Sequence, residues 1–179
     1  DRIKSMIETR PDWCISRQRI WGVPLPLFVS KKTKEPLKDP EIIENIAKIY
    51  EKEGADCWFT DDPQKFLGKK YKKEDYIKSN DIVEVWFDSG ATHSYVLEKR
   101  KDLTWPASMY LEGSDQHRGW FHSSLLESCG TRGRAPFNSI LTHGFVVDGK
   151  GLKMSKSTGN IIAPEDILKK YGADILRAW

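Results

Sequence analysis

The sequence predicts an α/β fold with a parallel sheet, on two observations made from residue 81 onward. First, strand-like segments alternate with a helical one: 81–87 (DIVEVWF), 108–113 (SMYLEG) and 137–147 (FNSILTHGFVV) read as strands, and 115–130 (DQHRGWFHSSLLESCG) as a helix. Second, polar, glycine-containing stretches follow the last two strands. Strand–helix–strand order favours parallel pairing through a right-handed crossover. Ligands bind beyond the carboxyl ends of such strands, so these two loops are the expected binding edge.

The elements outside this unit follow from local signals. Residues 25–29 read as extended after a Pro-x-Pro, and 31–40 as a turn. Residues 41–53 read as a helix that places Ile42, Ile46, Ile49 and Tyr50 on one face and stops at Gly54. Residues 60–80 alternate lysine with acidic residues, which favours a solvated face over a binding site. Residues 163–172 predict a helix with Pro164 at its first position.

Composition bounds the class of protein. The chain has 179 residues, 39% hydrophobic and 31% charged, with a net charge of +3, which neither requires nor excludes a nucleic-acid partner. Three widely spaced cysteines without a C-x-x-C pair argue against a disulfide framework or a four-cysteine zinc site and predict a cytoplasmic setting. No apolar run approaches the ~20 residues of a membrane span, and no secretory signal is visible. The abrupt ends, DRIKSM and DILRAW, predict a piece of a larger protein.

The stretch 146–160 (VVDGKGLKMSKSTGN) presents Lys153 and Lys156 among hydroxyl side chains and glycines. It fits neither the Walker A spacing nor the dinucleotide fingerprint. What remains is a glycine-hinged loop that presents the ammonium groups of Lys153 and Lys156, which suit phosphate and could close on it. The alternative is a solvated basic loop, which residue types alone favour.

The stretch 110–121 (YLEGSDQHRGWF) places Glu112 and Asp115 on either side of Gly113 at the end of a strand. Gly113 permits close backbone approach to a ligand, and a carboxylate here can accept hydrogen bonds from ribose hydroxyls or an ammonium group. The alternative is a helix cap at Asp115 beside a merely exposed Glu112.

Aromatic and histidine residues add weaker signals. Trp86, expected on a strand, and Trp120, on the next helix, could frame a small apolar pocket, although core packing is the commoner use of such residues. His143 and Gly144 end a strand where the backbone could approach a flat base. His117 and His122 lie five apart, the wrong spacing for one metal on a helix, so no metal site is predicted.

Taken together, these motifs resemble the class I aminoacyl-tRNA synthetases. KMSKS (153–157) is identical to the second signature of that family, and WFDSG (86–90), YLEGSDQHRGWF (110–121) and LTHGF (141–145) precede it in the family's order. RPDWCISRQRIWGVP (10–24) is similar to the end of the connective insertion in the Ile/Val/Leu branch, and GSDQHRGWF resembles the bacterial isoleucyl enzymes.

The resemblance implies ATP-dependent activation of L-isoleucine to isoleucyl-adenylate, followed by transfer to tRNA(Ile), with Mg²⁺ accompanying ATP. It implies that Lys153 and, above all, Lys156 hold the phosphates in the transition state, where positioned cations supply the catalysis. It also implies adenylate contacts for Glu112, Gly113, Asp115, Gln116, His143 and Gly144, and an isoleucine pocket walled by Trp86 and Trp120.

The resemblance further implies an architecture. Residues 1–80 would be the C-terminal part of the connective insertion, 81–160 the second half of a Rossmann-type nucleotide-binding sheet ending in the KMSKS loop, and 161–179 the start of the helical region leading to the anticodon-binding domain. The family's first signature, His-x-Gly-His, does not occur here, nor do cysteine pairs for a zinc site. The editing centre should lie outside the chain. We therefore expect the chain alone not to activate isoleucine.

Two other hypotheses stay open on the residues. One is a stand-alone module that keeps a nucleotide- or tRNA-binding surface without activation. The other is a structural α/β domain with a basic loop, which predicts that Lys156→Ala leaves adenylate formation unchanged.

Overall fold

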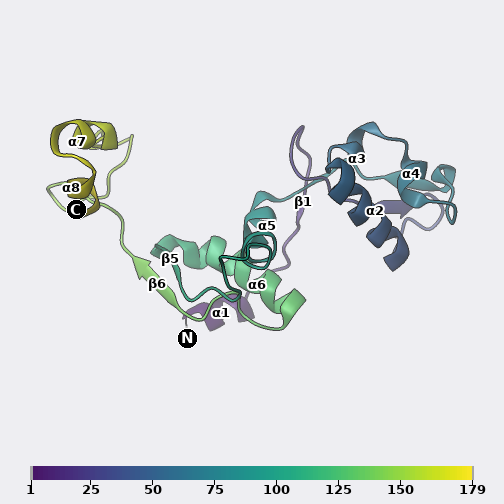
Figure 1. The fold of residues 1–179 in the computed structure, drawn as a ribbon, viewed down its shortest axis with the longest axis horizontal. Helices are drawn as coiled ribbons and strands as arrows, with labels where there is room; N and C mark the ends of the chain where they lie inside the picture. Colours follow the sequence, from purple (N-terminus) through teal and green to yellow (C-terminus); the bar gives the residue numbers. More distant parts are fainter. Residues whose placement is uncertain (1, 179) are drawn as a thin grey trace.

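A computed structural model describes residues 2–178 and places them in three lobes (Figure 1). The central lobe contains α1 (Arg2–Glu8), β1 (Ser16–Arg17), β4 (Ile82–Val83), α5 (Val85–Gly90), the π-helical turn η2 (His93–Leu97), β5 (Tyr110–Gly113), the 3₁₀ turn η3 (Ser114–Arg118), α6 (Trp120–Arg132) and β6 (Ile140–His143). The inserted lobe, residues 25–81, contains β2 (Phe28–Ser30), α2 (Pro40–Glu53), α3 (Cys57–Thr60), α4 (Pro63–Leu67), η1 (Lys73–Asp75) and β3 (Tyr76–Lys78). The C-terminal lobe contains α7 (Pro164–Tyr171) and α8 (Ala173–Ala178).

The inserted lobe leaves and re-enters the central lobe at one place. β1 pairs antiparallel with β4, with Ser16 opposite Val83 and Arg17 opposite Ile82. The lobe has its own antiparallel pair, β2 with β3. Because entry and exit strands are hydrogen-bonded neighbours, the lobe is attached to the central lobe through a single two-stranded stem.

The helix predicted over 41–53 is confirmed as α2. Its start is fixed by Asp39, whose carboxylate accepts a hydrogen bond from the Glu41 N–H at 3.0 Å, and by Pro40 in the first turn. Its end is fixed by Gly54, whose φ of 85° disfavours any residue with a side chain. Ile42 and Ile46 are buried, as the predicted face requires.

An aromatic core holds the inserted lobe together. The side chains of Trp58, Phe66 and Leu67 are 0% exposed, and the ring centroids of Trp58 lie 5.1 Å from Phe28 and 4.9 Å from Phe66. Burying a side chain of this size stabilises a fold by about 1.5–3 kcal/mol. The stretch 60–80 was predicted as a solvated face, yet it supplies two of these core residues.

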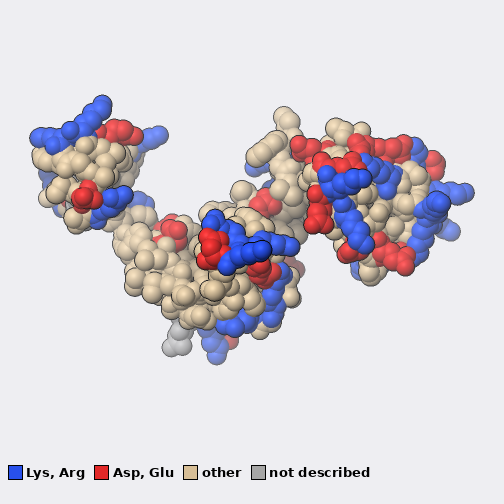
Figure 2. Space-filling model, in the orientation of Figure 1, with Lys and Arg blue, Asp and Glu red and all other residues tan. Residues whose placement is uncertain are grey.

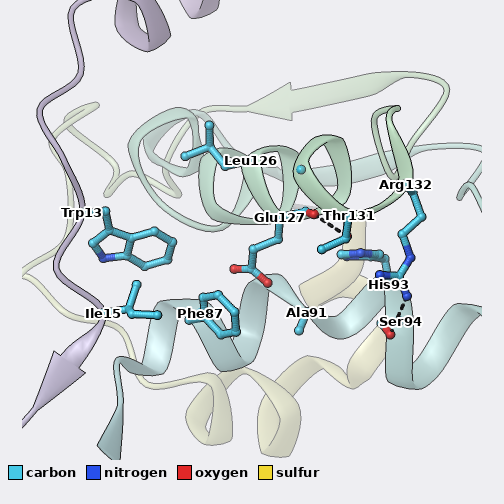
Figure 3. A pocket seen from close by; sticks show the side chains of 11 residues that line it. Trp13, Ile15, Phe87, Ala91, His93, Ser94, Leu126, Glu127, Thr131 and Arg132 are labelled. Carbon is cyan, nitrogen blue, oxygen red and sulfur yellow. Dashed lines mark hydrogen bonds between the residues drawn. The ribbon is translucent and has the colours of Figure 1, made fainter. Parts of the chain in front are cut away.

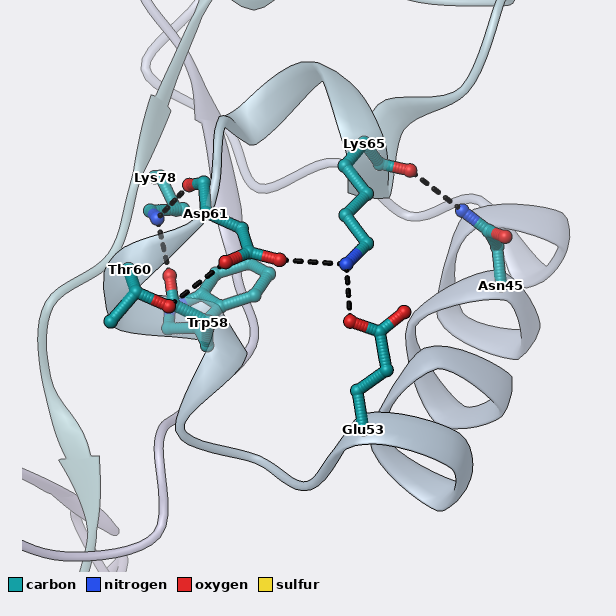
Figure 4. A network of polar contacts seen from close by, with 7 residues as sticks. All are labelled: Asn45, Glu53, Trp58, Thr60, Asp61, Lys65 and Lys78. Carbon is teal, nitrogen blue, oxygen red and sulfur yellow. Dashed lines mark hydrogen bonds and ion pairs between the residues drawn. The ribbon is translucent and has the colours of Figure 1, made fainter.

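A network of ion pairs and hydrogen bonds lies beside the core of the inserted lobe (Figure 4). The Lys65 ammonium group lies 2.7 Å from the Asp61 carboxylate and also contacts Glu53. The Lys78 ammonium group donates to the backbone carbonyls of Trp58 and Asp61, and burial lowers its pKa. These contacts join α2, α3, α4 and β3 around the core.

The parallel pairing predicted from the sequence is confirmed for β5 and β6. Tyr110 lies opposite Ile140, and Gly113 opposite His143. α6 lies between the two strands in the chain, so 110–143 forms a β–α–β unit. The sheet has two strands in the described residues 2–178, and the other two sheets there are antiparallel pairs.

The strand predicted over 81–87 is wrong beyond Val83. Residues 85–90 form α5, because Glu84 acts as a helix cap: its carboxylate accepts a hydrogen bond from the Trp86 N–H at 3.0 Å. Trp86 therefore lies on a helix. Alternating apolar residues in a short run cannot distinguish a strand from a helix that buries one side.

The other two central predictions are right in type and wrong in extent. The helix expected over 115–130 is divided into η3 and α6 at Gly119, whose φ of −131° and ψ of −122° interrupt the helical path. Asp115 thus lies in the first turn of η3 and not of α6. The strand expected over 137–147 is continuous only at Ile140–His143, and Phe137 and Val147 make isolated bridges with Ala107 and Lys153.

The C-terminal helix predicted over 163–172 is confirmed as α7. Pro164 occupies its first turn with Glu165 and Asp166, and Gly172, with a φ of 84°, ends it. None of the helices described in the structure is long and apolar enough to cross a membrane.

Candidate functional site: the carboxyl edge of β5 and β6

The parallel register places four of the predicted site residues at one edge. Gly113 pairs with His143, and Glu112 with Thr142. A Cβ built on Gly113 would lie 2.5 Å from the Asp115 Oδ1 atom and 3.9 Å from the His143 Cε1 atom. The structure therefore brings Glu112, Gly113, Asp115 and His143 together, and it leaves the space beside Gly113 too tight for any side chain unless Asp115 moves.

The edge is open and carries unneutralised charge. Glu112, Asp115, His143 and Gly144 are exposed. The His143 Nδ1 atom lies 2.7 Å from the Gly144 carbonyl oxygen, which fixes the imidazole ring against the turn that follows β6. Two carboxylates beside exposed backbone can accept hydrogen bonds from hydroxyl or ammonium groups of a ligand.

Gln116 connects this edge to α6. Its Oε1 atom accepts a hydrogen bond from the Trp120 N–H at 2.9 Å, and its Nε2 atom donates to the Asp115 carboxylate at 3.2 Å. The residue before α6 is Gly119, which has no side chain to cap the helix, so the Gln116 side chain caps it instead. Gln116 orients Asp115 as well as lining the edge.

The two predicted tryptophans lie in different surroundings. Trp120 stacks on Tyr110, with ring centroids 4.3 Å apart, and its indole N–H donates to the Ser89 carbonyl oxygen at 2.8 Å. Trp86 is 45% exposed on α5. Ser89 also belongs to α5, so Trp120 connects the helix that carries Trp86 to Tyr110 at the start of β5.

The KMSKS loop, residues 146–160, is held by a polar network that the sequence interpretation missed. The Asp148 carboxylate accepts hydrogen bonds from the N–H groups of Lys150 and Leu152 and from the Asn160 side chain at 2.9 Å. These bonds, Asn160 first, lower the pKa of Asp148. The Asn160 Oδ1 atom accepts from the Ser155 N–H at 2.9 Å. An Asp followed by Gly-Lys-Gly is a turn signal that could have revealed it.

Lys153 and Lys156, the two lysines of the KMSKS signature, differ in their contacts. The Lys153 ammonium group lies 3.7 Å from the centroid of the Phe145 ring, a cation–π contact. Lys156 is exposed, and among residues 2–178 its ammonium group has no hydrogen-bond or ion-pair partner. The loop lies beyond the tip of β6 towards α7 and α8 (Figure 1). Of these two lysines, Lys156 is therefore the one whose ammonium group is free to meet a ligand.

A parallel β–α–β unit with carboxylates at its carboxyl edge, followed by a lysine loop, is the arrangement of a nucleotide-binding α/β protein. The sequence matches the family described as tRNA synthetases class I (I, L, M and V) over residues 1–179. The chain belongs to this family.

Two similar proteins are isoleucine–tRNA ligases. The isoleucine–tRNA ligase of Pelagibacter ubique (strain HTCC1062) is 81% identical over 179 residues, which is 100% of this chain and 20% of that protein. The isoleucine–tRNA ligase of Caldicellulosiruptor saccharolyticus is 58% identical over 184 aligned residues, with the same two coverages. The chain thus spans about a fifth of the length of these relatives.

A solved structure supports the fold. The LeuRS of Agrobacterium radiobacter K84, in a ternary LeuRS-tRNA-LeuAMS complex, matches with a TM-score of 0.61 and 19% identity, over 98% of this chain and 26% of that one. At this identity the match supports the α/β synthetase fold and carries no residue assignment.

Proposed function

We propose that the chain is the part of an isoleucine–tRNA ligase that binds the aminoacyl-adenylate and contacts the phosphates of ATP. In this reaction the L-isoleucine carboxylate forms a bond to the α-phosphorus of ATP, and the bond from that phosphorus to pyrophosphate breaks. The isoleucyl group then passes to a ribose hydroxyl of tRNA(Ile), and AMP leaves. The observation that carries the proposal is the 81% identity to an isoleucine–tRNA ligase across all 179 residues, including the KMSKS loop.

The geometry of the edge suits an adenylate. Asp115, oriented by Gln116, can accept from ribose hydroxyls, and Gly113 beside it has no side chain that would displace this carboxylate. Glu112 can accept from the ammonium group of the amino acid. His143 and Gly144 end the neighbouring strand, where a flat base would lie. Trp86 and Trp120 would flank the isoleucine side chain.

The lysines act on the phosphates. Charge accumulates on the phosphate oxygens as pyrophosphate leaves, so an ammonium group placed there lowers the barrier. Lys156 needs to break no contact to do so, whereas Lys153 would leave the Phe145 ring. Mg²⁺ would arrive with ATP. No cluster of three or more His, Cys, Asp or Glu side chains within residues 2–178 is arranged to hold a metal, so we assign no residue of this chain to it.

The finer architecture belongs to the same proposal. Residues 81–160 form the second half of a Rossmann-type catalytic sheet, 1–80 return from a connective insertion, and 161–179 lead to an anticodon-binding region. The setting is the cytoplasm. The identity to isoleucine–tRNA ligases over the whole chain supports this assignment over a stand-alone binding module.

Lys156→Ala in the complete natural polypeptide that contains this chain tests the proposal. We expect isoleucine-dependent ATP–pyrophosphate exchange to fall about 10²–10³-fold, the usual cost of removing one group that stabilises developing charge. Lys150→Ala, in the same loop, is the matched control and should have little effect. Equal rates in the two variants would contradict the assignment and favour a plain basic loop.

We also expect the 179-residue chain alone to show no such exchange, because it carries only one set of the phosphate-binding groups. Detectable isoleucine-dependent exchange by the purified chain would contradict this.

A further inference from the structure

A cavity of about 440 Å³ lies in the central lobe, away from the carboxyl edge of β5 and β6. It is bounded by the segment that carries Trp13 and Ile15, by α5 and η2, and by α6 (Figure 3). Most of its wall is apolar, with Trp13, Phe87 and Leu126 as its largest such residues. The Glu127 carboxylate reaches from α6 into the space between Trp13 and Phe87.

Two polar atoms at this cavity have no partner among residues 2–178. One is the Glu127 Oε1 atom and the other is the His93 Nε2 atom; both are buried. His93 is 1% exposed, and its Nδ1 atom lies 3.0 Å from the Gly90 carbonyl oxygen. A carbonyl oxygen can only accept, so Nδ1 carries the proton and a neutral ring leaves Nε2 as an acceptor. Both atoms are therefore acceptors without a hydrogen-bond donor.

The charges that face Glu127 do not supply one. Arg132, the cation on the cavity wall, is held by Glu98 at 2.9 Å and by the Ser94 hydroxyl. Arg10 lies over the Trp13 ring at 5.1 Å. Asp88 on α5 adds negative charge. Burial and then Asp88 raise the pKa of Glu127 to about 8. The cavity thus has two unpartnered acceptor atoms and an acidic bias, and no cation among residues 2–178 pairs with the Glu127 carboxylate.

We propose that this cavity is a docking site for a segment of the longer polypeptide that brings a lysine or arginine side chain to Glu127. The proposal rests on the proposed function, in which this chain is part of a ligase about five times its length. The stem of a lysine or arginine would lie along Trp13, Phe87 and Leu126, as such stems do on apolar surfaces. Its head would donate to the Glu127 carboxylate, and donors of the same segment would reach His93 Nε2.

The test compares Glu127→Gln with the unchanged complete polypeptide by thermal unfolding at pH 6, 7, 8 and 9. Gln keeps the size of the side chain and removes its charge. A paired carboxylate stays ionised throughout this range. We therefore expect the Tm of Glu127→Gln to lie several degrees below that of the unchanged polypeptide, with the same difference at each pH. Glu127→Asp keeps the charge and should unfold between the two.

An unpaired buried carboxylate gives the opposite pattern. Its folded pKa of about 8 lies above the unfolded value of about 4.3, so the folded state binds more protons and loses stability as pH rises towards 8. The Gln variant would then be the more stable protein at pH 8 and 9, and would rank above Asp. That ranking, or no difference at any pH, would overturn the proposal.

Other occupants give distinct results. A stabilisation by Glu127 that grows with protein concentration would assign the site to a second copy. One that appears only on adding an alkylguanidinium salt would assign it to a free cation. Either would overturn the proposal. Isoleucine-dependent ATP–pyrophosphate exchange is measured on the same samples below their Tm. If the unchanged protein shows no exchange, the proposed function fails; if it shows exchange but the unfolding results contradict the docking site, only the docking proposal fails.

Discussion

The inserted lobe and the carboxyl edge of β5 and β6 use similar residues in different ways. In the inserted lobe, Trp58 is fully buried and Lys65 is held by two carboxylates. At the edge, Glu112 and Asp115 are exposed, and Lys156 in the following loop has no partner among the described residues. Figure 2 shows that charges of both signs cover the visible face of the inserted lobe, whereas the central lobe has a wide uncharged area beside a cluster of charged side chains. Where charges are paired locally the lobe is built for stability, and where they are left unpaired a ligand can use them.

Trp58→Ala tests the stability side of this comparison and should have the largest effect. Removing the indole from the centre of the core should destabilise the inserted lobe by about 3–5 kcal/mol. Phe59→Ala is the matched control, because Phe59 is 41% exposed. Its loss of unfolding free energy should be much smaller than that of Trp58→Ala. Urea unfolding of the complete polypeptide, followed by hydrogen exchange of residues 25–81, measures both. Similar losses in the two variants would contradict the core assignment.

Gly113→Ala tests the ligand side. The added Cβ would lie 2.5 Å from the Asp115 Oδ1 atom and displace that carboxylate. We expect isoleucine-dependent exchange to fall about 10–100-fold, which is ~1.4–2.7 kcal/mol, with little change in Tm. Gly149→Ala is the control, since nothing lies within 4 Å of its added Cβ. A loss of Tm that accounts for the lost activity would show that Gly113 is structural.

Trp120→Ala tests whether one residue contributes both to the packing of the central lobe and to isoleucine binding. Loss of the wall of the pocket should raise the KM for isoleucine about tenfold more than the KM for ATP. Some stability will be lost too, because the Tyr110 stack and the Ser89 hydrogen bond disappear. Trp120→Phe retains an aromatic ring on Tyr110, so relative to Trp120→Ala it should restore more of the Tm than of the affinity for isoleucine. Equal increases of both KM values would remove Trp120 from the pocket.

Asp39→Asn should have the smallest effect and tests whether a charge in the inserted lobe serves only stability. Asn retains a cap for α2 but loses the contacts with Lys70 and Tyr71, which lower the pKa of Asp39 to about 2. Because the folded pKa is below the unfolded value of about 3.9, the stabilisation is complete above that pH and disappears as pH falls towards 2. The difference in Tm between the two proteins should be constant from pH 7 to 5 and shrink below 4. A difference that does not change with pH would mean that the charge contributes nothing.

The sequence predicted best where a local signal determines the structure. Asp39, Pro40 and Gly54 mark the ends of α2, and Pro164 and Gly172 mark those of α7, because caps and φ preferences act within a few residues. Parallel pairing of β5 and β6 also followed, since strand–helix–strand order leaves few topologies.

It failed where a local pattern is ambiguous or where packing decides. α5 was predicted as a strand although the Glu84 cap is local, because a short apolar run fits a strand as well as a helix that buries one side. The orphan atoms of Glu127 and His93 could not be predicted either, because they depend on how α5, η2 and α6 pack. The site residues at the edge were named from the family resemblance, and the register explains why four of them lie together.

The most direct test of the proposed function is a crystal structure of the complete polypeptide with a non-hydrolysable isoleucyl-adenylate analogue. We expect the adenine beside His143 and Gly144, the ribose at Gly113 and Asp115, and the isoleucine side chain between Trp86 and Trp120, with Lys156 nearest the phosphate. An analogue bound away from the carboxyl edge of β5 and β6 would contradict the proposal.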